Sequence, residues 1–435
     1  MTKTVKTLAA AAVLVAACVF SVMLLFDSGL FHEAGLRMMA AALLALVFVF
    51  GFSLAAVGAN AQSAHGVLWL AALCAAAICV RCYYFEAHSG DYVSFLAKWV
   101  EYFRQNGGFK GLGGSVGNYN VTYLYFLALF SYSPLHDLYL IKLLSIVFDF
   151  VLAFYVMKLT QHIGRRKWAL WAFFVVLFLP TVVINGAKWA QCDSIYAAFA
   201  VAALYYALKN KMPLSLAMLA IAFSFKLQTA FIMPLWAVFF FTGRLKARWL
   251  WVFPAAFILA VLPALLLGKP FGEIIDIYVG QTEIYSDWLN LNSPSVYALL
   301  TPSDGKTARW MGIAAAFLLC AVVIAAAVFA KRKNSAKLYA CYGLVLCIGV
   351  PWLLPHMHER YFYIADVLSA ALALADFKFI PVCALVQLSS FACYMVYYGT
   401  PILSLKMASI LMGAALLLAA VLTAFCLIFR SKREN

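Results

Sequence analysis

The chain has 435 residues, of which 66% are hydrophobic and 11% are charged, and its formal net charge at pH 7 is +15. A soluble domain carries roughly 25% charged residues, so a water-soluble protein is excluded and an all-α polytopic membrane protein is expected. The positive charge does not indicate a nucleic-acid partner, because lysine and arginine gather in the cytoplasmic loops of membrane proteins.

Apolar runs recur along almost the whole chain, and we predict a bundle of about 12–14 transmembrane helices, since each needs about 20 apolar residues. Fourteen runs fall near residues 8–26, 36–58, 67–85, 138–160, 168–184, 194–208, 212–225, 229–241, 249–267, 310–330, 338–354, 361–376, 379–397 and 402–429. The first run follows two lysines and lacks a small-residue cleavage site, so we expect a retained span rather than a signal peptide.

The basic clusters orient the bundle, because lysine and arginine mark short cytoplasmic loops. With fourteen spans, all six clusters fall on one side, so both termini are expected in the cytoplasm. The clusters are Lys3/Lys6, Arg165–Lys167, Lys209/Lys211, Arg244/Lys246/Arg248, Lys331–Lys337 and Arg430–Arg433. The outer face then receives two long polar loops, residues 81–123 and 268–309, and most of the carboxylates. The chemistry is therefore expected outside.

One apolar segment, Val121 to Phe130, is treated differently. Ten residues of helix span roughly 15 Å at 1.5 Å per residue, which is too short for a hydrocarbon core of about 30 Å. Counting this segment as a span would also place every later basic cluster outside. We therefore expect a helix that dips into or lies on the outer face.

The first outer loop contains Asp91, which follows Gly90 and precedes an aromatic series at helical spacing. That series predicts an amphipathic helix at the membrane surface; its members are Tyr92, Phe95, Trp99 and Phe103. Two interpretations of Asp91 stay open. Its carboxylate can cap this helix, or it can act as a general base toward an incoming hydroxyl.

Two further outer segments combine charged and amide side chains. Lys188, Gln191 and Asp193 stand at a span entrance, where Asp193 can cap the next helix and the other two can meet a polar substrate. Lys226 and Gln228 separate two short apolar segments, which favours backbone that lines a polar cavity rather than lipid. Lys226 can snorkel to the interface, or it can bind a phosphate.

Residues 355–361, Pro-His-Met-His-Glu-Arg-Tyr, place His356, His358, Glu359 and Arg360 at an outer span end. A metal site is one interpretation, but two histidines at i and i+2 lack the i, i+4 spacing of a zinc-binding helix. Arg360 and one histidine can instead bind an anionic leaving group. A plain interfacial charge cluster is the third interpretation.

The ordered set of these motifs resembles the GT-C superfamily, the integral-membrane glycosyltransferases that use polyprenyl-phosphate sugars, and its bacterial mannosyltransferase-like members in particular. The motifs that carry the resemblance are Arg81 and Tyr84, Gly90–Tyr92, Trp99, Gly107, Asn118–Asn120, Trp189–Ser194, Phe223–Gln228 and Pro355–Tyr361. The resemblance implies a GT-C-like catalytic core at residues 67–400. Residues 1–66 are then two additional helices, and residues 401–435 are a last helix with a basic cytoplasmic tail.

Residue by residue, the resemblance implies that Asp91 is the catalytic base. It places Lys226, His358 and Arg360 near the donor phosphate. Further residues are expected in the substrate cavity: Tyr92, Tyr119, Asn120, Lys188, Gln191, Asp193, Gln228, His356 and Glu359. Because Asp91 has no adjacent acidic partner, we expect a metal-independent reaction with no cofactor.

The expected activity is an inverting transfer of a sugar from a polyprenyl-phosphate donor to a hydroxyl of a glycan, lipid or protein acceptor. Such a donor carries a good leaving group, so the protein must deprotonate the acceptor and neutralise the departing phosphate. A lipid-linked sugar flippase or transporter would share the broken segments. A polysaccharide polymerase or ligase is the other alternative. The expected location is a bacterial plasma membrane.

Overall fold

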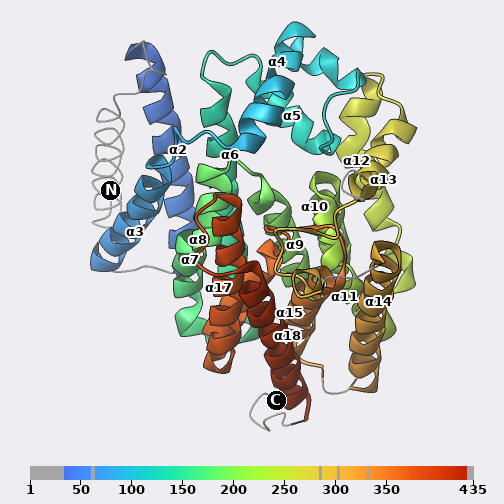
Figure 1. Cartoon of the computed structure of the whole chain (residues 1–435). Helices are drawn as coiled ribbons and strands as arrows, with labels where there is room; N and C mark the ends of the chain where they lie inside the picture. The colour runs from blue at the N-terminus through green and yellow to red at the C-terminus, as the bar shows by residue number, and fades with distance from the viewer. Residues whose placement is uncertain (1–33, 60–63, 284–286, 301–303, 331–333, 429–435) are drawn as a thin grey trace.

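The computed structural model describes residues 34–59, 64–283, 287–300, 304–330 and 334–428 (Figure 1). These residues are almost entirely helical, with two strands of two residues each, so the prediction of an all-α protein is confirmed. Several predicted features lie outside the described residues: the first span near residues 8–26, the basic residues Lys3, Lys6 and Lys331–Lys333, and the tail after residue 428.

Seven described helices are long and apolar enough to cross a membrane, or eight if one bent pair counts as a span, so the chain is a multi-pass membrane protein. The seven are α2 (Ala34–Ala59), α6 (Asp137–Ile163), α12 (Val252–Leu266) with the turn before it, α14 (Gly305–Phe329), α15 (Ala336–Leu353), α17 (Ile380–Tyr397) and α18 (Leu405–Ile428). Six shorter apolar segments are Gly66–Cys82 within α3 (Ala64–Cys82), α5 (Val121–Phe130), α9 (Asp193–Leu208), α10 (Met212–Phe225), Leu227–Phe241 with α11 (Pro234–Phe241), and α16 (Tyr363–Ala375).

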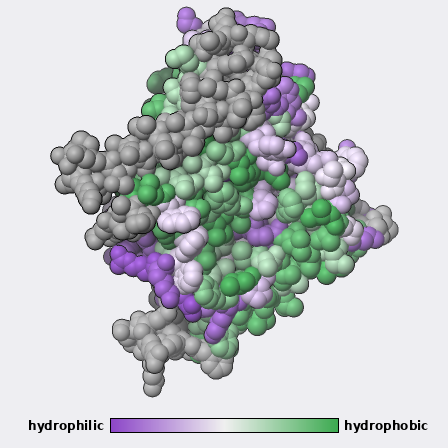
Figure 2. All heavy atoms as spheres, turned by 90° about the vertical axis from the view of Figure 1, so that its left-hand side faces the viewer, coloured by the Kyte–Doolittle hydropathy of each residue, from purple (hydrophilic) through white to green (hydrophobic). Residues whose placement is uncertain are grey.

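The bundle has a buried centre and a lipid-compatible rim. α9 buries 13 of its 16 residues, as expected of a helix that is apolar on every side. In contrast, only 17–22% of the apolar windows of α12, α14 and α18 is buried inside the protein. Figure 2 shows hydrophobic residues gathered over the middle of one face, with hydrophilic residues toward its ends.

A proline bends the segment that leads to the polar turn after residue 188. α7 (Ala169–Phe178) and α8 (Pro180–Val183) belong to two halves that meet at 48°. Leu179, which precedes the proline, has ψ 126°, because a residue before proline disfavours the helical conformation. The second half ends in a π-helical turn, η4 (Ile184–Lys188), and delivers Trp189 to Asp193 into the interior.

The short segments near Lys226 fold as predicted. α10 ends at Phe225, Lys226 is extended with φ −150° and ψ 137°, and a 3-10 turn, η5 (Leu227–Phe231), leads into α11. The predicted short helix at Val121–Phe130 is also present as α5, and seven of its ten residues are buried by neighbouring protein. Figure 1 shows α4 (Ala97–Gln105) and α5 at one end of the molecule and the end of α18 at the other.

Two predicted loop boundaries need correction. Arg81 is not a loop residue; it lies in the last turn of α3 and is fully buried. The second outer loop, residues 268–309, is not simply a loop, because it contains α13 (Phe271–Glu283) and the start of α14. It also contains β1 (Asn290–Leu291), which pairs in parallel with β2 (Met357–His358). This pairing joins the second outer loop to residues 355–361, the histidine-rich segment.

Two buried cations fix the chain in front of Asp91. Arg81 donates from Nε to Asp149 Oδ2 at 2.8 Å, and both side chains are 0% exposed. Lys142 donates from Nζ to the carbonyls of Tyr84, Phe85 and Ala87 at 2.6, 2.8 and 2.7 Å. These carbonyls belong to the turn that follows α3, so Lys142 fixes the backbone of that turn.

Arg81→Met is expected to destabilise the protein by about 3–5 kcal/mol, because it leaves the Asp149 carboxylate buried without its partner. Thermal unfolding of the purified protein in detergent measures the loss. The matched control is Arg104→Met, which removes an exposed partner of Glu101 and should cost about 0–1 kcal/mol. If Asp149→Leu does not restore the stability of Arg81→Met, the ion pair is not the cause.

Labelling tests the predicted orientation of the bundle. We expect Lys110→Cys, on the exposed surface after α4, to react with an impermeant maleimide added to intact cells. Arg166→Cys, on the exposed turn after α6, should react only after the membrane is permeabilised. The native cysteines in the described part of the chain are buried or half-buried, and the unmodified chain is the background control. The reverse pattern would contradict the orientation derived from the basic clusters.

Candidate active site

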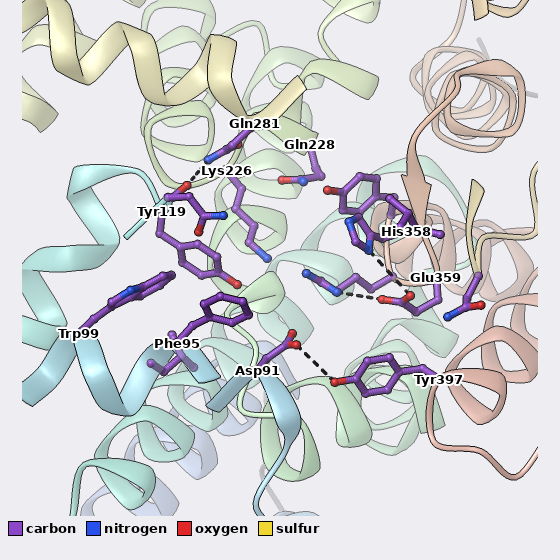
Figure 3. Close-up of a pocket in the computed structure, with 16 residues that line it drawn as sticks. Asp91, Phe95, Trp99, Tyr119, Lys226, Gln228, Gln281, His358, Glu359 and Tyr397 are labelled. Atoms are coloured by element: carbon purple, nitrogen blue, oxygen red, sulfur yellow. Dashed lines mark hydrogen bonds and ion pairs between the residues drawn. The ribbon is translucent and has the colours of Figure 1, made fainter. Parts of the chain in front are cut away.

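A cavity of about 280 Å³ brings together residues from seven separate parts of the chain (Figure 3). Its wall includes charged, amide and aromatic side chains, which is the composition typical of a site that binds a polar ligand. The sixteen lining residues are Asp91, Phe95, Leu96, Trp99, Asn118, Tyr119, Lys226, Gln228, Gln281, Leu291, Asn292, His358, Glu359, Arg360, Tyr361 and Tyr397.

Asp91 stands at the start of a helical stretch, where η1 (Tyr92–Leu96) runs into α4. Its carboxylate makes no capping hydrogen bond, so the capping interpretation is wrong. Ser89 takes that place, because its Oγ accepts from the backbone N–H of Tyr92 at 3.1 Å. Asp91 Oδ2 instead accepts from Trp189 Nε1 at 3.0 Å and from Gln191 Nε2 at 2.5 Å.

Lys226 is held by the break between α10 and η5, and its side chain is only 9% exposed, so it does not snorkel to a surface. Nζ donates to Asp193 Oδ1 at 2.6 Å and to Gln191 Oε1 at 3.4 Å, and it lies 5.4 Å from the ring centre of Tyr119. Asp193 therefore serves as the partner of a buried cation. The N-cap position of α9 is taken by Cys192, and Asp193 lies in the first turn, so the predicted capping alternative is wrong here too.

The histidine-rich segment contributes the second cation. Arg360 donates from Nη1 to Glu359 Oε1 at 2.8 Å, and its Nε lies 3.9 Å from Asp193 Oδ2. The guanidinium also lies 5.1 Å from the ring centre of Trp189. Lys226 and Arg360 thus approach the same carboxylate, Asp193, from two different segments.

Burial controls the protonation of the two neighbours of Arg360. Burial raises the pKa of Glu359 to about 7, although Arg360 beside it lowers this pKa. Burial, together with the positive charges of Arg360 and Lys226, lowers the pKa of His358 well below its ordinary value. The imidazole of His358 is therefore neutral at pH 7, so it can offer a hydrogen bond but no charge.

Six of the nine predicted cavity residues do not line this cavity, and four of them make contacts elsewhere. Tyr92 points to Asp137 and donates to its Oδ1 at 3.0 Å. Asn120 is buried behind the wall, where its Oδ1 accepts from Gln281 at 3.1 Å. Lys188 lies 3.9 Å from the ring centre of Tyr398. His356 bonds the carbonyl of Trp288 at 2.6 Å, and it has a left-handed φ of 62°.

The remaining predicted residues gather at or directly behind the cavity wall. Tyr119, Gln228, His358 and Glu359 line it with Asp91 and the two cations, while Gln191 and Asp193 stand behind them and are 1% exposed. Within the described part of the chain, no three His, Cys, Asp or Glu side chains lie close enough to hold a metal ion.

Sequence reasoning missed three residues of the site. Trp189 belongs to a motif identified in the sequence, but no role was predicted for it. Its indole N–H donates a hydrogen bond to Asp91. Tyr397 ends an apolar helix, and its hydroxyl donates to Asp91 Oδ1 at 3.3 Å. Gln281 lies on α13, which was taken for loop, and it donates to the carbonyl of Asn118 at 2.7 Å. Tyrosine and tryptophan at helix ends look like membrane-interface residues, so the sequence held no signal for these two roles.

Residues 125–242 match the model of a protein family described as alpha-(1->6)-mannopyranosyltransferase, N-terminal domain, the MptA_B family. The matched stretch contains Gln191, Asp193, Lys226 and Gln228, whereas Asp91 and the histidine-rich segment lie outside it. No curated protein matches the chain. The family match confirms the resemblance to a GT-C-type mannosyltransferase and supports a glycosyltransferase activity.

Proposed function

We propose that this chain transfers a sugar from a polyprenyl-phosphate donor to an acceptor hydroxyl at the outer face of a bacterial plasma membrane, with both termini in the cytoplasm. The observation that carries the proposal is one cavity of about 280 Å³ that presents the Asp91 carboxylate together with Lys226 and Arg360. A base and two cations facing one space match the two demands of this reaction. The acceptor must lose a proton, and the phosphate must leave with its charge balanced.

Asp91 acts as the general base. The acceptor hydroxyl gives its proton to the carboxylate while its oxygen attacks the anomeric carbon of the donor sugar. The bond between that carbon and the phosphate oxygen breaks, and its electron pair leaves with the polyprenyl phosphate. This single displacement, in which the acceptor attacks opposite the leaving group, inverts the anomeric configuration.

Lys226 and Arg360 bind the phosphate of the donor. An arginine offers paired N–H donors to phosphate oxygens, and a lysine offers a compact positive charge. Before the donor arrives, Asp193 pairs with Lys226 and Glu359 accepts a hydrogen bond from Arg360, so neither cation is buried without a partner. The aromatic rings of Phe95, Trp99 and Tyr119 supply apolar surface on which a sugar ring can pack.

We propose that the reaction needs no metal ion, because two protein cations already face the position of the leaving phosphate. Transfer is expected to stay within about twofold of its untreated rate in 5 mM EDTA and to gain no more than that from added Mg²⁺ or Mn²⁺; a loss of about tenfold or more would assign the phosphate charge to a metal. Initial rates of the same purified preparation, measured before and after chelation, provide this test.

The experiment that tests the activity uses the purified full chain in lipid nanodiscs. It is incubated with a panel of polyprenyl-phosphate sugars, starting with mannose because of the family match. Release of polyprenyl phosphate, together with a glycoside of inverted configuration by NMR, is the expected result. Movement of the intact lipid-linked sugar across proteoliposomes without phosphate release would favour a flippase. Use of a lipid-linked glycan as donor, but of no monosaccharide donor, would favour a polymerase or ligase.

A further inference from the structure

The two oxygens of the Asp91 carboxylate are held very differently. Oδ2 accepts two hydrogen bonds from buried donors, Trp189 Nε1 at 3.0 Å and Gln191 Nε2 at 2.5 Å. From the described part of the chain, Oδ1 accepts one hydrogen bond, from the hydroxyl of Tyr397 at 3.3 Å. Bonds between a hydroxyl and an oxygen normally measure about 2.5–3.0 Å, so the contact at Oδ1 is weak.

We propose that Trp189 and Gln191 are positioning residues that hold Oδ2, so that Oδ1 is the atom that takes the proton from the acceptor hydroxyl. The acceptor hydroxyl displaces the weakly bound hydroxyl of Tyr397. Oδ2 is saturated by its two donors, whereas the one partner of Oδ1 in the described part of the chain is Tyr397, which lines the cavity together with Asp91 (Figure 3). This inference rests on the proposed glycosyl transfer and adds which residues aim the base and which oxygen reacts.

A strained backbone turn brings both donors to the same oxygen. Ala190, between Trp189 and Gln191, has φ 64°, a left-handed conformation that residues with a side chain rarely adopt. Backbone bonds fix the turn on both sides, from Trp189 N to Ile184 O at 2.8 Å and from Gln191 N to Asn185 O at 2.9 Å. The buried surroundings thus maintain a costly conformation whose result is the convergence of two donors on Asp91.

The same turn is tied directly to the loop that carries Asp91. Ser89 donates from Oγ to the carbonyl of Trp189 at 2.6 Å. The same Ser89 Oγ accepts a hydrogen bond from the backbone N–H of Tyr92. Ser89 therefore links the tryptophan, the start of the helix and the carboxylate. The distance between Asp91 and its two donors is set by short, buried contacts.

Each donor is locked in its orientation. The Gln191 amide has its Oε1 occupied by Tyr119, which donates at 2.8 Å, and by Lys226 at 3.4 Å, so its NH₂ group must face Asp91. The Trp189 ring stacks on Tyr397 with centres 3.9 Å apart and planes at 24°. Both donors are at most 1% exposed, so water cannot replace their N–H groups. Gln191 also connects the base to Lys226, the proposed phosphate ligand.

The test compares Trp189→Phe and Gln191→Glu with the unchanged protein, using the purified full chain and a donor it accepts. Trp189→Phe keeps an aromatic ring against Tyr397 but removes one donor from Oδ2. We expect kcat to fall about 10- to 100-fold while the KM for the donor changes less than about threefold. The acid limb of the kcat profile should move to higher pH, because the charged carboxylate loses a hydrogen bond. Gln191→Glu should move it the same way by adding a negative charge.

The pH readout is a comparison with the unchanged protein, because Glu359, whose pKa is about 7, contributes to the acid limb of every variant. Tyr119 and Lys226 face the site from one side, Glu359 and Arg360 from the histidine-rich segment, and Tyr397 and Tyr398 from the end of α17. The matched control is Trp236→Phe, which removes a buried indole bond of the same length, 3.0 Å, to Ser215 Oγ. It should change neither kcat nor the pH profile.

Three outcomes overturn the inference. Wild-type kcat in Trp189→Phe shows that the bond to Oδ2 does not matter. A lower kcat with an unmoved pH profile in both folded variants shows a purely structural role. In Tyr397→Phe we expect the KM for the acceptor to fall, because the acceptor no longer has to displace the tyrosine hydroxyl. A raised KM for the acceptor would show that this hydroxyl binds the acceptor instead. If the unchanged protein transfers no sugar, the proposed function fails first and the inference fails with it.

Discussion

Asp91→Asn lowers kcat for sugar transfer by about 10³-fold or more, with donor affinity retained, if Asp91 takes the proton from the acceptor. General-base catalysis contributes typically about 10²- to 10⁴-fold, and an amide cannot accept the proton. Asparagine has the size of aspartate, and its oxygen can still accept from Trp189 and Gln191, so the loop should keep its structure. Steady-state kinetics with a polyprenyl-phosphate sugar, combined with donor binding, measures both effects.

The control for this variant is Glu101→Gln, which makes the same chemical change in the same outer loop. The Glu101 side chain is 52% exposed and pairs with Arg104 on the surface of α4. Its replacement should leave kcat within about twofold of wild type, since exposed pairs contribute little. Turnover of Asp91→Asn at the wild-type rate would remove Asp91 from the role of base. Equal losses in both variants would indicate a general effect of charge in the loop.

Lys226→Met is expected to lower kcat/KM for the donor by about 10²- to 10³-fold, the usual effect of removing one group that stabilises a developing negative charge. Methionine replaces most of the side-chain volume but not the charge. The variant also leaves Asp193 without its 2.6 Å partner, so a loss of stability is expected together with the loss of activity. Kinetics alone would not separate these two causes.

The double variant Lys226→Met/Asp193→Asn separates them. Removing both charges of the pair should restore most of the thermal stability, because no unpaired charge stays buried. If Lys226 binds the donor phosphate, activity stays low in this stable protein, and the KM for the donor rises more than the KM for the acceptor. If the double variant regains wild-type kinetics, Lys226 is a structural partner of Asp193 and not a phosphate ligand.

The sequence was informative where physical chemistry acts locally. Hydropathy marks apolar helices whatever they pack against, and an ionisable residue between two short apolar segments predicted the break at Lys226. Asp91, Lys226 and Arg360 could be singled out because charged groups are costly in such a chain. Adjacent residues were harder to place. Tyr92 follows Asp91 directly, but neighbouring helical residues point about 100° apart, so Tyr92 faces Asp137 instead of the cavity.

Other features depend on tertiary contacts and leave no periodic signal. Strands of two residues, such as those that join Asn290–Leu291 to Met357–His358, are shorter than any pattern that alternation can reveal. α13 carries glycines and carboxylates that also suit a loop. The hydroxyl of Tyr397 reaches Asp91 from 306 positions further along the chain, and only the folded bundle brings the two together.

That separation has a consequence for biogenesis. At the usual elongation rates of about 5–20 residues per second, roughly 15–60 seconds pass between synthesis of Asp91 and synthesis of Tyr397. During this interval the nascent chain contains Asp91 but neither Arg360 nor Tyr397. The helices inserted last therefore complete the cavity, and a ribosome-bound chain that has not reached them lacks part of the proposed active site.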